Sequence, residues 1–435
     1  MKPRAPHRIP DPSPEPRIVR MEKPVYGGAF LARDQGKAVF VPLTLPGEEA
    51  RVRIVEDKGG YAKAEAAEIL APAPERVTPE CRHFGACGGC HYQHAGYEAQ
   101  LRFKQSILRE TLERAGVQPP EEIAVLSASP WAYRNRIRLA VDPAGNPGYR
   151  ARRSHAIVPI AECPIAAPLL VRAALAAAEI ARKSPPAQRP SEISLFCDAE
   201  ESALLTDIYA GERAKLPFEE FCRALAGPVP EFQGAEYVLE DRTGRSRTVA
   251  QWGATSLGYR AAGFTYRVDH GAFFQVNRWL VDALVERVIA GHSGGLAWDL
   301  FAGVGLFARR LAANFARVVA VESGPSATAA LEHNLRGTGA AVERSATLDF
   351  LQHSHRGEQP ELVIVDPPRT GLGAETTALL ARCAAPALVY VSCDPATLAR
   401  DLHALIGSGY GIQEMALADL FPQTFHIETI VRLRR

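Results

Sequence analysis

The sequence has no run of about 20 apolar residues, the length that a membrane-spanning helix requires. Its first residues, MKPRAPHRIPDPSPEPR, include no apolar stretch of the kind found in secretory signals. Neither sign of charge dominates, because 50 Lys and Arg residues stand against 49 Asp and Glu residues, and this excludes a generally polycationic protein. A local basic face could still bind a phosphate backbone. We therefore expect a cytoplasmic protein, with a monomer as the default state.

Cysteine is scarce, and its eight residues do not suggest the framework of a disulfide-rich protein. Cys81, Cys87 and Cys90 crowd into ten residues, which instead indicates a metal or cluster site. The 435 residues are too many for one ordinary domain, and this length predicts two to four domains.

The pattern of residues divides the chain into four parts. Residues 1–14 are rich in proline and charge and are expected to form a flexible tail. Short alternating runs separated by Gly, Pro and Asp predict a small OB-like β-barrel at 15–75. Residues 76–265 mix strand-like and helical patterns, as in an α+β domain, with a helix expected at 97–116. Apolar strands alternate with helices over 266–435, which predicts an α/β fold with a Rossmann-like, doubly wound and mostly parallel sheet.

The loop after the first strand of this sheet has the features of a nucleotide-binding turn. The segment DLFAGVG closes a strand and opens a helix, so Gly303 and Gly305 let the backbone approach a ligand closely. Glu322 ends the next strand, where a carboxylate can accept hydrogen bonds from both ribose hydroxyls. The glycine spacing also fits a dinucleotide site loosely, so this motif alone does not separate NAD from S-adenosylmethionine. The acidic Asp299 and the absence of a third glycine favour S-adenosylmethionine.

Two further strand ends carry reactive groups. Asp366 in DPPR (366–369) could hold the polar edge of a planar base, because the two prolines force an extended turn. Cys393 in SCDP (392–395) precedes a helix for which Asp394 is a natural N-cap. The positive end of that helix would stabilise a thiolate, which predicts a nucleophile.

These groups fit the methylation of uracil at C5. Carbon 5 is not nucleophilic enough to take a methyl group unaided, but attack of a thiolate at C6 makes it an enolate-like carbon that can displace a sulfonium methyl group. A general base must afterwards remove the C5 proton so that the cysteine can leave. Glu428 is the carboxylate near the chain end that is best suited to this step.

The motifs resemble, in their order along the chain, those of the class I, S-adenosylmethionine-dependent RNA uracil-5-methyltransferases. They are FFQVN (273–277), DLFAGVG (299–305), DPPR (366–369), SCDP (392–395) and HIET (426–429). The resemblance implies that Cys393 is the nucleophile and Glu428 the base. It also implies that the S-adenosylmethionine and uracil site is lined by Gln275, Phe301, Gly303, Gly305, Glu322, Asp349 and Asp366. Leu306 departs from the family pattern, because a polar side chain is common after the second glycine.

The cysteine cluster has ligand-like spacing, with glycines at 85, 88 and 89 that allow the chain to wrap tightly. Cys163 in AECPI could close a four-thiolate site with Cys81, Cys87 and Cys90. Four thiolates suit zinc or an iron–sulfur cluster, and the spacing does not distinguish the two. The pattern resembles the branch of the family that carries a [4Fe–4S] cluster. That resemblance implies an iron–sulfur cofactor that fixes the fold and the RNA-binding surface.

Two regions are expected to bind RNA. Residues 18–71 resemble the TRAM domain, a small RNA-binding β-barrel, by their strand pattern and by GKAVFVPLTLPGE (36–48). Further along, Tyr133 and Tyr149 flank a run of arginines, which are Arg134, Arg136, Arg138, Arg150, Arg152 and Arg153. In an alternating strand the first three arginines would share one face, so we expect phosphate contacts and base stacking there.

We therefore predict an enzyme that methylates C5 of one uridine in structured RNA. The preferred substrate is 23S ribosomal RNA, because the barrel and the cluster resemble that branch of the family, and transfer RNA is the second candidate. The presence of both Cys393 and Glu428 argues against a non-catalytic RNA-binding protein. DPPR and SCDP at adjacent strand ends argue against an NAD-dependent oxidoreductase.

Overall fold

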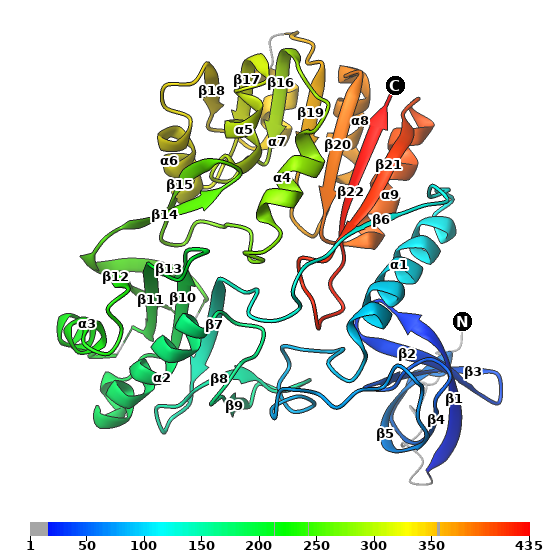
Figure 1. Ribbon diagram of the computed structural model, residues 1–435, viewed down its shortest axis with the longest axis vertical. Helices are drawn as coiled ribbons and strands as arrows, with labels where there is room; N and C mark the ends of the chain where they lie inside the picture. Colours follow the sequence, from blue (N-terminus) through cyan, green and yellow to red (C-terminus); the bar gives the residue numbers. More distant parts are fainter. Residues whose placement is uncertain (1–15, 213, 242, 355–356) are drawn as a thin grey trace, which may run out of the picture. The chain divides into compact units, whose positions relative to one another are not determined.

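The computed structural model describes residues 16–212, 214–241, 243–354 and 357–435 (Figure 1). The expected tail at 1–14 lies outside the described residues. Internal contacts divide the chain into two compact units. The smaller unit comprises residues 1–107 and 423–426, and the larger unit comprises residues 108–422 and 427–435.

The smaller unit contains a closed β-barrel, as predicted. Its strands follow the order β1-β2-β3-β5-β4 around the barrel. The strands are β1 (Arg17–Val25), β2 (Ala29–Asp34), β3 (Lys37–Pro42), β4 (Glu49–Asp57) and β5 (Tyr61–Ala71). Buried and more exposed residues alternate along β4, so that Ala50, Val52 and Ile54 point into the barrel core. The helix α1 (Tyr97–Arg114) follows close to the expected range, and the chain then turns at Gly116, which has φ +77°.

The first half of the larger unit is built on a mixed sheet of seven strands in its described residues. The order is β13-β12-β11-β10-β7-β8-β9. The strands are β7 (Arg136–Val141), β8 (Pro147–Arg150), β9 (Ile157–Pro159), β10 (Glu192–Cys197), β11 (Leu204–Gly211), β12 (Phe232–Glu240) and β13 (Ser246–Gly253). The helices α2 (Pro168–Lys183) and α3 (Phe218–Ala226) pack their apolar sides against this sheet in one core. This arrangement is the α+β fold that the mixed sequence pattern predicts.

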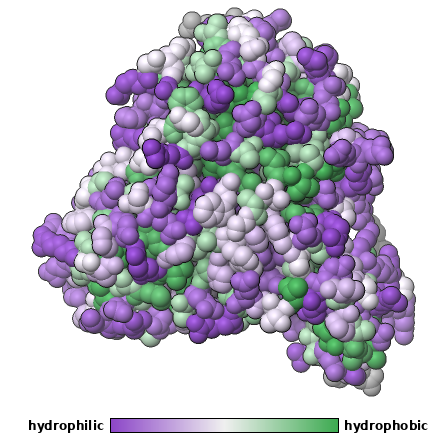
Figure 2. Space-filling view, in the orientation of Figure 1, coloured by the Kyte–Doolittle hydropathy of each residue, from purple (hydrophilic) through white to green (hydrophobic). Residues whose placement is uncertain are grey.

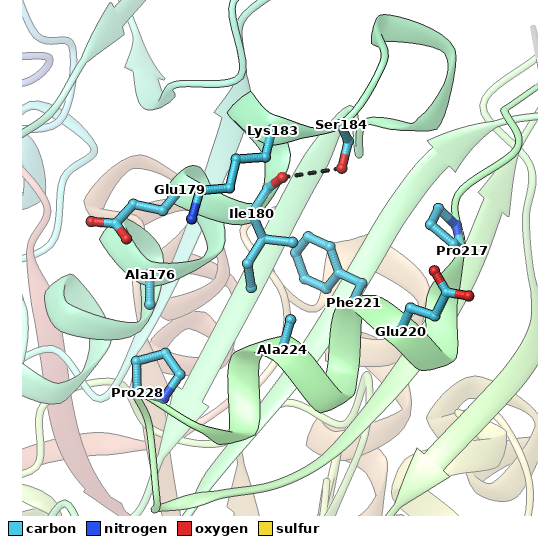
Figure 3. Close-up of a pocket in the computed structure, with 10 residues that line it drawn as sticks. All are labelled: Ala176, Glu179, Ile180, Lys183, Ser184, Pro217, Glu220, Phe221, Ala224 and Pro228. Carbon is cyan, nitrogen blue, oxygen red and sulfur yellow. Dashed lines mark hydrogen bonds between the residues drawn. The ribbon is translucent and has the colours of Figure 1, made fainter.

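A cavity of about 440 Å³ lies between α2 and α3 (Figure 3). Its lining residues are Ala176, Glu179, Ile180, Lys183, Ser184, Pro217, Glu220, Phe221, Ala224 and Pro228. None of them belongs to a motif that carries chemistry in the sequence; those motifs lie in the second sheet and the segment before it.

The second half of the larger unit begins with a hairpin of β14 (Ser256–Ala261) and β15 (Phe264–Asp269) and continues into a sheet of eight described strands. Its order is β18-β17-β16-β19-β20-β22-β21-β6. The strands are β6 (Ala124–Leu126), β16 (Gly294–Leu300), β17 (Phe315–Val321), β18 (Ala340–Glu343), β19 (Leu362–Val365), β20 (Ala387–Ser392), β21 (Gly411–Ala418) and β22 (Glu428–Arg434). The helices that flank it in Figure 1 are α4 (Val281–Ile289), α5 (Leu306–Leu311), α6 (Pro325–Asn334), α7 (Thr347–Asp349), α8 (Gly373–Cys383) and α9 (Pro395–Gly407).

The connections of this sheet explain where its ligands bind. The strands from β18 through β20 pair in parallel, as the alternation of apolar strands and helices predicts. From β16 the chain builds β17 and β18 on one side and β19 and β20 on the other, so the order switches at β16. Parallel sheets bind ligands beyond the carboxyl ends of their strands at such a switch point. The antiparallel β22, inserted between β20 and β21, brings the end of the chain back beside β20.

The surface is polar over most of the face in Figure 2, with apolar side chains gathered in patches. Large apolar side chains left exposed in the smaller unit include Ile18 and Val77. Within the described ranges, no helix is both long and apolar enough to cross a membrane.

Candidate active site

The glycine loop after β16 has the backbone geometry of a cofactor cradle. Phe301, Gly303 and Gly305 all have positive φ values, of +67°, +56° and +90°. The backbone N–H of Gly303 donates to the Glu322 carboxylate at 2.9 Å, which joins the loop to the end of β17. A Cβ atom at Gly303 would meet no described atom within 4 Å, so open space faces the loop there. At Gly305 a Cβ would lie 2.7 Å from Leu331 Cδ1, so this glycine is needed for packing.

Asp299, near the end of β16, is a fully buried acid. Neither of its carboxyl oxygens has a hydrogen-bond partner of good geometry among the described residues, and the nearest donor is the Ala308 backbone N–H. Burial raises the pKa of Asp299 to about 7; the Ala308 N–H lowers it, and the carboxylates of Asp366 and Glu322 raise it further. A buried acceptor of this kind is expected to have a ligand group as its partner.

The other expected cofactor residues occupy different environments. Gln275 is buried, and its segment is described below. Asp349 is exposed at the end of α7, which follows β18. Leu306 is buried in the hydrophobic core, which gives a structural reason for an apolar residue where the family pattern favours a polar one.

The helix start after β20 is built as the sequence predicts. Asp394 is the N-cap of α9, and its Oδ1 accepts hydrogen bonds from the backbone N–H groups of Ala396 and Thr397, each at 3.0 Å. Pro395 occupies the first helical position, where its missing N–H leaves no bond unmade. Cys393 is therefore held at a fixed place between a buried strand and a capped helix.

Strand register places Glu428 close to this cysteine. In the antiparallel pair of β20 and β22, Ser392 faces Thr429, the last pair of the ladder. Cys393 and Glu428 adjoin this last pair, and the Glu428 carboxylate is near enough to act on the Cys393 thiol. The structure thus brings together two residues that are 35 positions apart in the sequence.

Burial and charge control protonation in this pair. Burial raises the pKa of Cys393 to about 12, and the carboxylates of Glu428 and Asp366 raise it while the Arg369 guanidinium lowers it. Burial also raises the pKa of Glu428 well above its ordinary value, with a further contribution from Asp366. The pKa of Asp366 rises to about 7 through burial. Burial and the two acids therefore oppose the stabilisation of a thiolate that the start of α9 is expected to provide.

The segment that carries Gln275 is fixed by backbone contacts to the central sheet. The Asn135 amide donates to the Gln275 carbonyl at 2.9 Å, and the Asn135 backbone N–H donates to Val276 at 3.0 Å. At the start of the segment, His270 Nδ1 lies 2.6 Å from Asp207 Oδ1 and its Nε2 lies 3.2 Å from the Ala254 carbonyl. The hydrogen bond to Asp207 counters burial and raises the pKa of His270. Both ends of the segment are thus anchored.

Two arginines of the predicted phosphate-binding face make contacts with protein groups. Arg136 and Arg138 do share one face of β7, but Arg136 lies with its guanidinium 4.1 Å from the Phe196 ring centre and donates to the Ala272 carbonyl at 2.7 Å. Arg138 pairs with Glu192 at 2.6 Å. Tyr133 is fully buried and donates to the Pro422 carbonyl, so it is not available for base stacking. The alternation of side chains along β7 correctly predicted that Arg136 and Arg138 share one face. It did not predict that each of them contacts a protein group there.

The cysteines of the expected cluster are distributed over the two units. Cys81, Cys87 and Cys90 belong to the smaller unit and Cys163 to the larger one, where its sulfur lies 3.7 Å from the Tyr149 hydroxyl. Gly85 has φ +89°, which fits the tight wrap expected between the first cysteines. In the part of the chain that the structure describes, no group of three or more His, Cys, Asp or Glu side chains is arranged to hold a metal ion.

The sequence analysis gave no role to Arg369 or Asp401. Arg369 directly follows the two prolines of DPPR, and its charge acts on both Cys393 and Glu428. Asp401 is 2% exposed and lies on the buried side of α9, between Leu398 and Leu402. An acid on an apolar helical stripe is the signal that could have identified it.

Comparison with known proteins identifies the family. A family model described as tRNA (Uracil-5-)-methyltransferase matches residues 353–435, and a TRAM domain model matches residues 19–67. The chain is 35% identical over 437 residues to the 23S rRNA (uracil(1939)-C(5))-methyltransferase RlmD of Chromohalobacter salexigens, with 95% of this chain and 88% of the relative covered. The chain belongs to the S-adenosylmethionine-dependent RNA uracil-5-methyltransferase family.

Two further similarities support this family. An uncharacterized RNA methyltransferase of Streptomyces avermitilis is 33% identical over 431 residues, with 94% of this chain and 95% of the relative covered. The crystal structure of Pyrococcus abyssi tRNA (uracil-54, C5)-methyltransferase in complex with S-adenosyl-L-homocysteine superposes with a TM-score of 0.77 at 25% identity, and covers 95% of this chain and 99% of that one. The predicted family, TRAM barrel, methyltransferase fold and S-adenosylmethionine dependence are confirmed, and the NAD-dependent oxidoreductase alternative is wrong.

Proposed function

We propose that this methyltransferase modifies C5 of a uridine in 23S ribosomal RNA through a covalent bond between Cys393 and uracil C6. The observation that supports this most strongly is the register of β20 and β22, which brings the cysteine close to a buried acid. The relatives named RlmD support the substrate, and by their names the target is the uridine equivalent to uracil 1939.

The chemistry uses Cys393 as nucleophile and Glu428 as base. The thiol first loses its proton to solvent, the thiolate sulfur then bonds to C6, and the electrons of the C5–C6 double bond move toward the carbonyl at C4. Once C5 carries the methyl group, the Glu428 carboxylate removes the C5 proton, the double bond re-forms and the sulfur departs. A buried carboxylate with a raised pKa is a strong proton acceptor when ionised, which suits it to this step.

Asp366 and Arg369 are proposed to assist from the loop after β19. With a pKa of about 7, Asp366 is available as a neutral acid that can donate a hydrogen bond to a uracil carbonyl as negative charge develops there. The Arg369 guanidinium favours the ionised forms of both Cys393 and Glu428. The extended Pro-Pro turn keeps both side chains on one short loop.

Residues at the carboxyl ends of β16 and β17 are proposed to bind S-adenosylmethionine, which supplies the methyl group. The buried carboxyl of Asp299 suits the cationic amino group, and Glu322 suits the ribose hydroxyls. The open space at Gly303 lets the backbone approach the cofactor. The remaining proposed contacts, carried over from the family motifs, are Gln275, Phe301, Gly305, Asp349 and Asp366.

The four cysteines Cys81, Cys87, Cys90 and Cys163 are proposed to hold a [4Fe–4S] cluster, with zinc as the alternative. The support is the spacing of the first three and the turn at Gly85. Iron and acid-labile sulfide in the anaerobically purified protein, lost together in Cys87→Ser, would support the cluster. Zinc in the purified protein without acid-labile sulfide would instead indicate a zinc site. The boundaries at 15–75, 76–265 and 266–435, a cytoplasmic location and a monomeric state are proposed with this assignment.

Transfer RNA is the second candidate substrate, because the similar Pyrococcus abyssi structure is that of a tRNA methyltransferase. The decisive experiment offers both RNAs, transcribed without modification, to the enzyme with labelled S-adenosylmethionine, and then identifies the labelled nucleoside. Label in 5-methyluridine of the 23S fragment supports the proposal. Label in transfer RNA alone would make transfer RNA the substrate. Bound cofactor without label in either RNA would favour a non-catalytic RNA-binding protein.

A further inference from the structure

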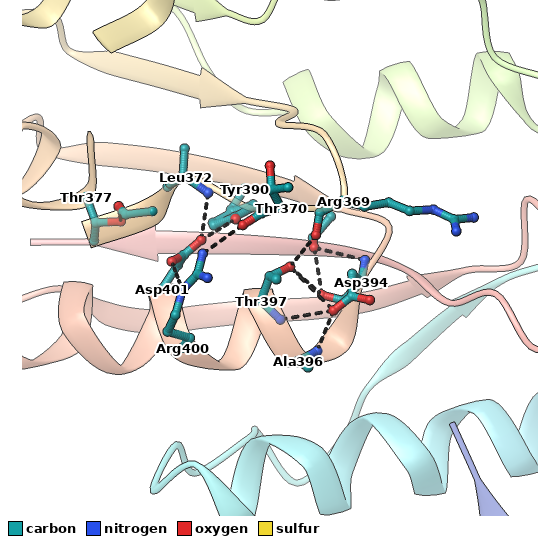
Figure 4. Close-up of polar contacts among 12 residues, drawn as sticks. Arg369, Thr370, Leu372, Thr377, Tyr390, Asp394, Ala396, Thr397, Arg400 and Asp401 are labelled. Carbon is teal, nitrogen blue, oxygen red and sulfur yellow. Dashed lines mark hydrogen bonds and ion pairs between the residues drawn. The ribbon is translucent and has the colours of Figure 1, made fainter. Parts of the chain in front are cut away.

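The loop that carries Asp366 and Arg369 is fastened to α9, the helix that follows the nucleophile (Figure 4). Three residues of the loop make hydrogen bonds to side chains on the first two turns of this helix. Thr397 Oγ1 donates to the Arg369 carbonyl at 3.2 Å, Arg400 Nη2 donates to the Thr370 carbonyl at 2.9 Å, and the Leu372 backbone N–H donates to Asp401 Oδ2 at 2.8 Å.

Asp401 is the centre of this set of contacts. It is 2% exposed and also accepts hydrogen bonds from the Tyr390 hydroxyl and from Arg400 Nε, each at 2.9 Å. Tyr390 belongs to β20, two residues before its end. The carboxylate of Asp401 therefore joins the nucleophile's strand, the nucleophile's helix and the loop with Arg369.

Gly371 shows how closely the loop backbone lies on α9. It has φ +70°, a conformation that side chains disfavour. A Cβ atom there would lie 2.6 Å from Asp401 Oδ2, 2.7 Å from Arg400 Nη2 and 2.9 Å from Thr397 Cβ. The loop backbone thus lies against side chains of α9, which leave no room for a side chain at this position.

We propose that Asp401 is a positioning residue of the methyltransferase, which locks the 366–372 loop onto α9 and so keeps the Arg369 guanidinium beside Cys393 and Glu428. The proposal rests on the proposed function only in taking Cys393 as the nucleophile. In this structure Arg369 extends its side chain away from the contacts on α9 (Figure 4), so those contacts hold its backbone and leave its guanidinium to act at the site.

The charges around Cys393 give the expected consequence. Glu428 faces it from β22, and Asp366 and Arg369 face it from the loop after β19. The two acids raise the pKa of the thiol and the guanidinium lowers it. If the loop loosens, the acids act without the opposing charge, so the thiol becomes harder to ionise. Because Arg369 is exposed, solvent screens its charge and the effect is modest.

The test measures alkylation of Cys393 by iodoacetamide in the full-length enzyme, followed by mass spectrometry of the peptide that contains it. Asp401→Asn is compared with wild type from pH 7 to 10. We expect about two- to fivefold slower alkylation at pH 8.5 and a profile moved to higher pH, the size expected for a partly exposed charge. Asp282→Asn is the matched control, because Asp282 on α4 accepts a backbone hydrogen bond from Ala262 at 2.8 Å. This control should leave the alkylation rate unchanged.

A double-mutant cycle shows whether Asp401 acts through Arg369. In an Arg369→Ala background, Asp401→Asn should slow alkylation no further. Equal slowing in both backgrounds, or a wild-type rate in Asp401→Asn alone, would overturn the proposal. If Asp401→Asn does not fold, Tyr390→Phe removes one of the donors to Asp401 and should slow alkylation in the same Arg369-dependent manner. Neither RNA nor S-adenosylmethionine is present, so failure of the proposed methylation reaction would appear in a separate assay.

Discussion

Replacing the buried acid Asp299 by Asn should remove the loss of stability that the cofactor-free enzyme undergoes as the pH rises. The side chain is fully buried, and burial raises its pKa to about 7 although the Ala308 backbone N–H lowers it. In the unfolded chain the pKa is about 3.9. The folded state therefore favours the protonated acid, so stability is greatest below pH 4 and falls as pH rises through the folded pKa.

The size of the effect follows from this difference in pKa. A difference of about three units at about 1.36 kcal/mol each corresponds to roughly 4 kcal/mol of lost stability above pH 7, of which about 3 kcal/mol develops between pH 5 and pH 8. The Asn variant cannot ionise and avoids this loss. Its own buried amide adds a constant cost that does not depend on pH, so the diagnostic quantity is the change with pH.

Urea unfolding followed by tryptophan fluorescence measures this change. All four tryptophans lie between residues 131 and 298, in the larger unit that contains Asp299. The stability of Asp299→Asn minus that of wild type should rise by about 3 kcal/mol from pH 5 to pH 8. S-adenosylmethionine should stabilise wild type more than the variant, because its cationic amino group would lose its carboxylate partner. An equal stability difference at both pH values would refute the reasoning.

Three other substitutions have distinct expected outcomes. Cys393→Ala should abolish methyl transfer while leaving RNA binding in a gel-shift assay largely intact, and loss of both together would contradict its role as nucleophile. Glu428→Gln should slow release of the adduct by about 10²–10⁴-fold, the usual contribution of a general base. Protein joined to RNA should therefore persist on a denaturing gel, and absence of that band would count against Glu428 as the base. Gly303→Ala should raise the KM for S-adenosylmethionine, because the added methyl group enters the open space beside the loop. An unchanged KM with only a lower unfolding midpoint would show that this glycine serves the fold alone.

The parallel strands of the catalytic sheet could be predicted because each has a local signal. Runs such as LVIV and ALVYVS are short, continuously apolar and end at Pro, Asp or Gly, and the structure buries them on both faces as β19 and β20. The insertion of β22 between β20 and β21 has no such signal, because it depends on which distant segment pairs with the open side of β20. The proximity of Cys393 and Glu428 depends on that pairing, so it had to come from the family motifs.

The sequence could not predict properties that depend on residues distant in the chain but close in space. Alternation in β7 correctly placed Arg136 and Arg138 on one face, but it could not show that Phe196 and Glu192 occupy that face. Likewise, the position of Cys393 before a helix is a local feature, whereas the pKa of its thiol is set mainly by burial and by acids from two other strand ends.

The central claim is tested most directly by methylation of unmodified RNA. Total RNA from a strain that lacks this gene is incubated with anaerobically purified enzyme and labelled S-adenosylmethionine, then separated by size and digested to nucleosides. The account predicts label in 5-methyluridine of the large ribosomal RNA and none with Cys393→Ala. Enzyme that binds the cofactor yet leaves every RNA fraction unlabelled, or a Cys393→Ala variant that still transfers the label, would contradict it.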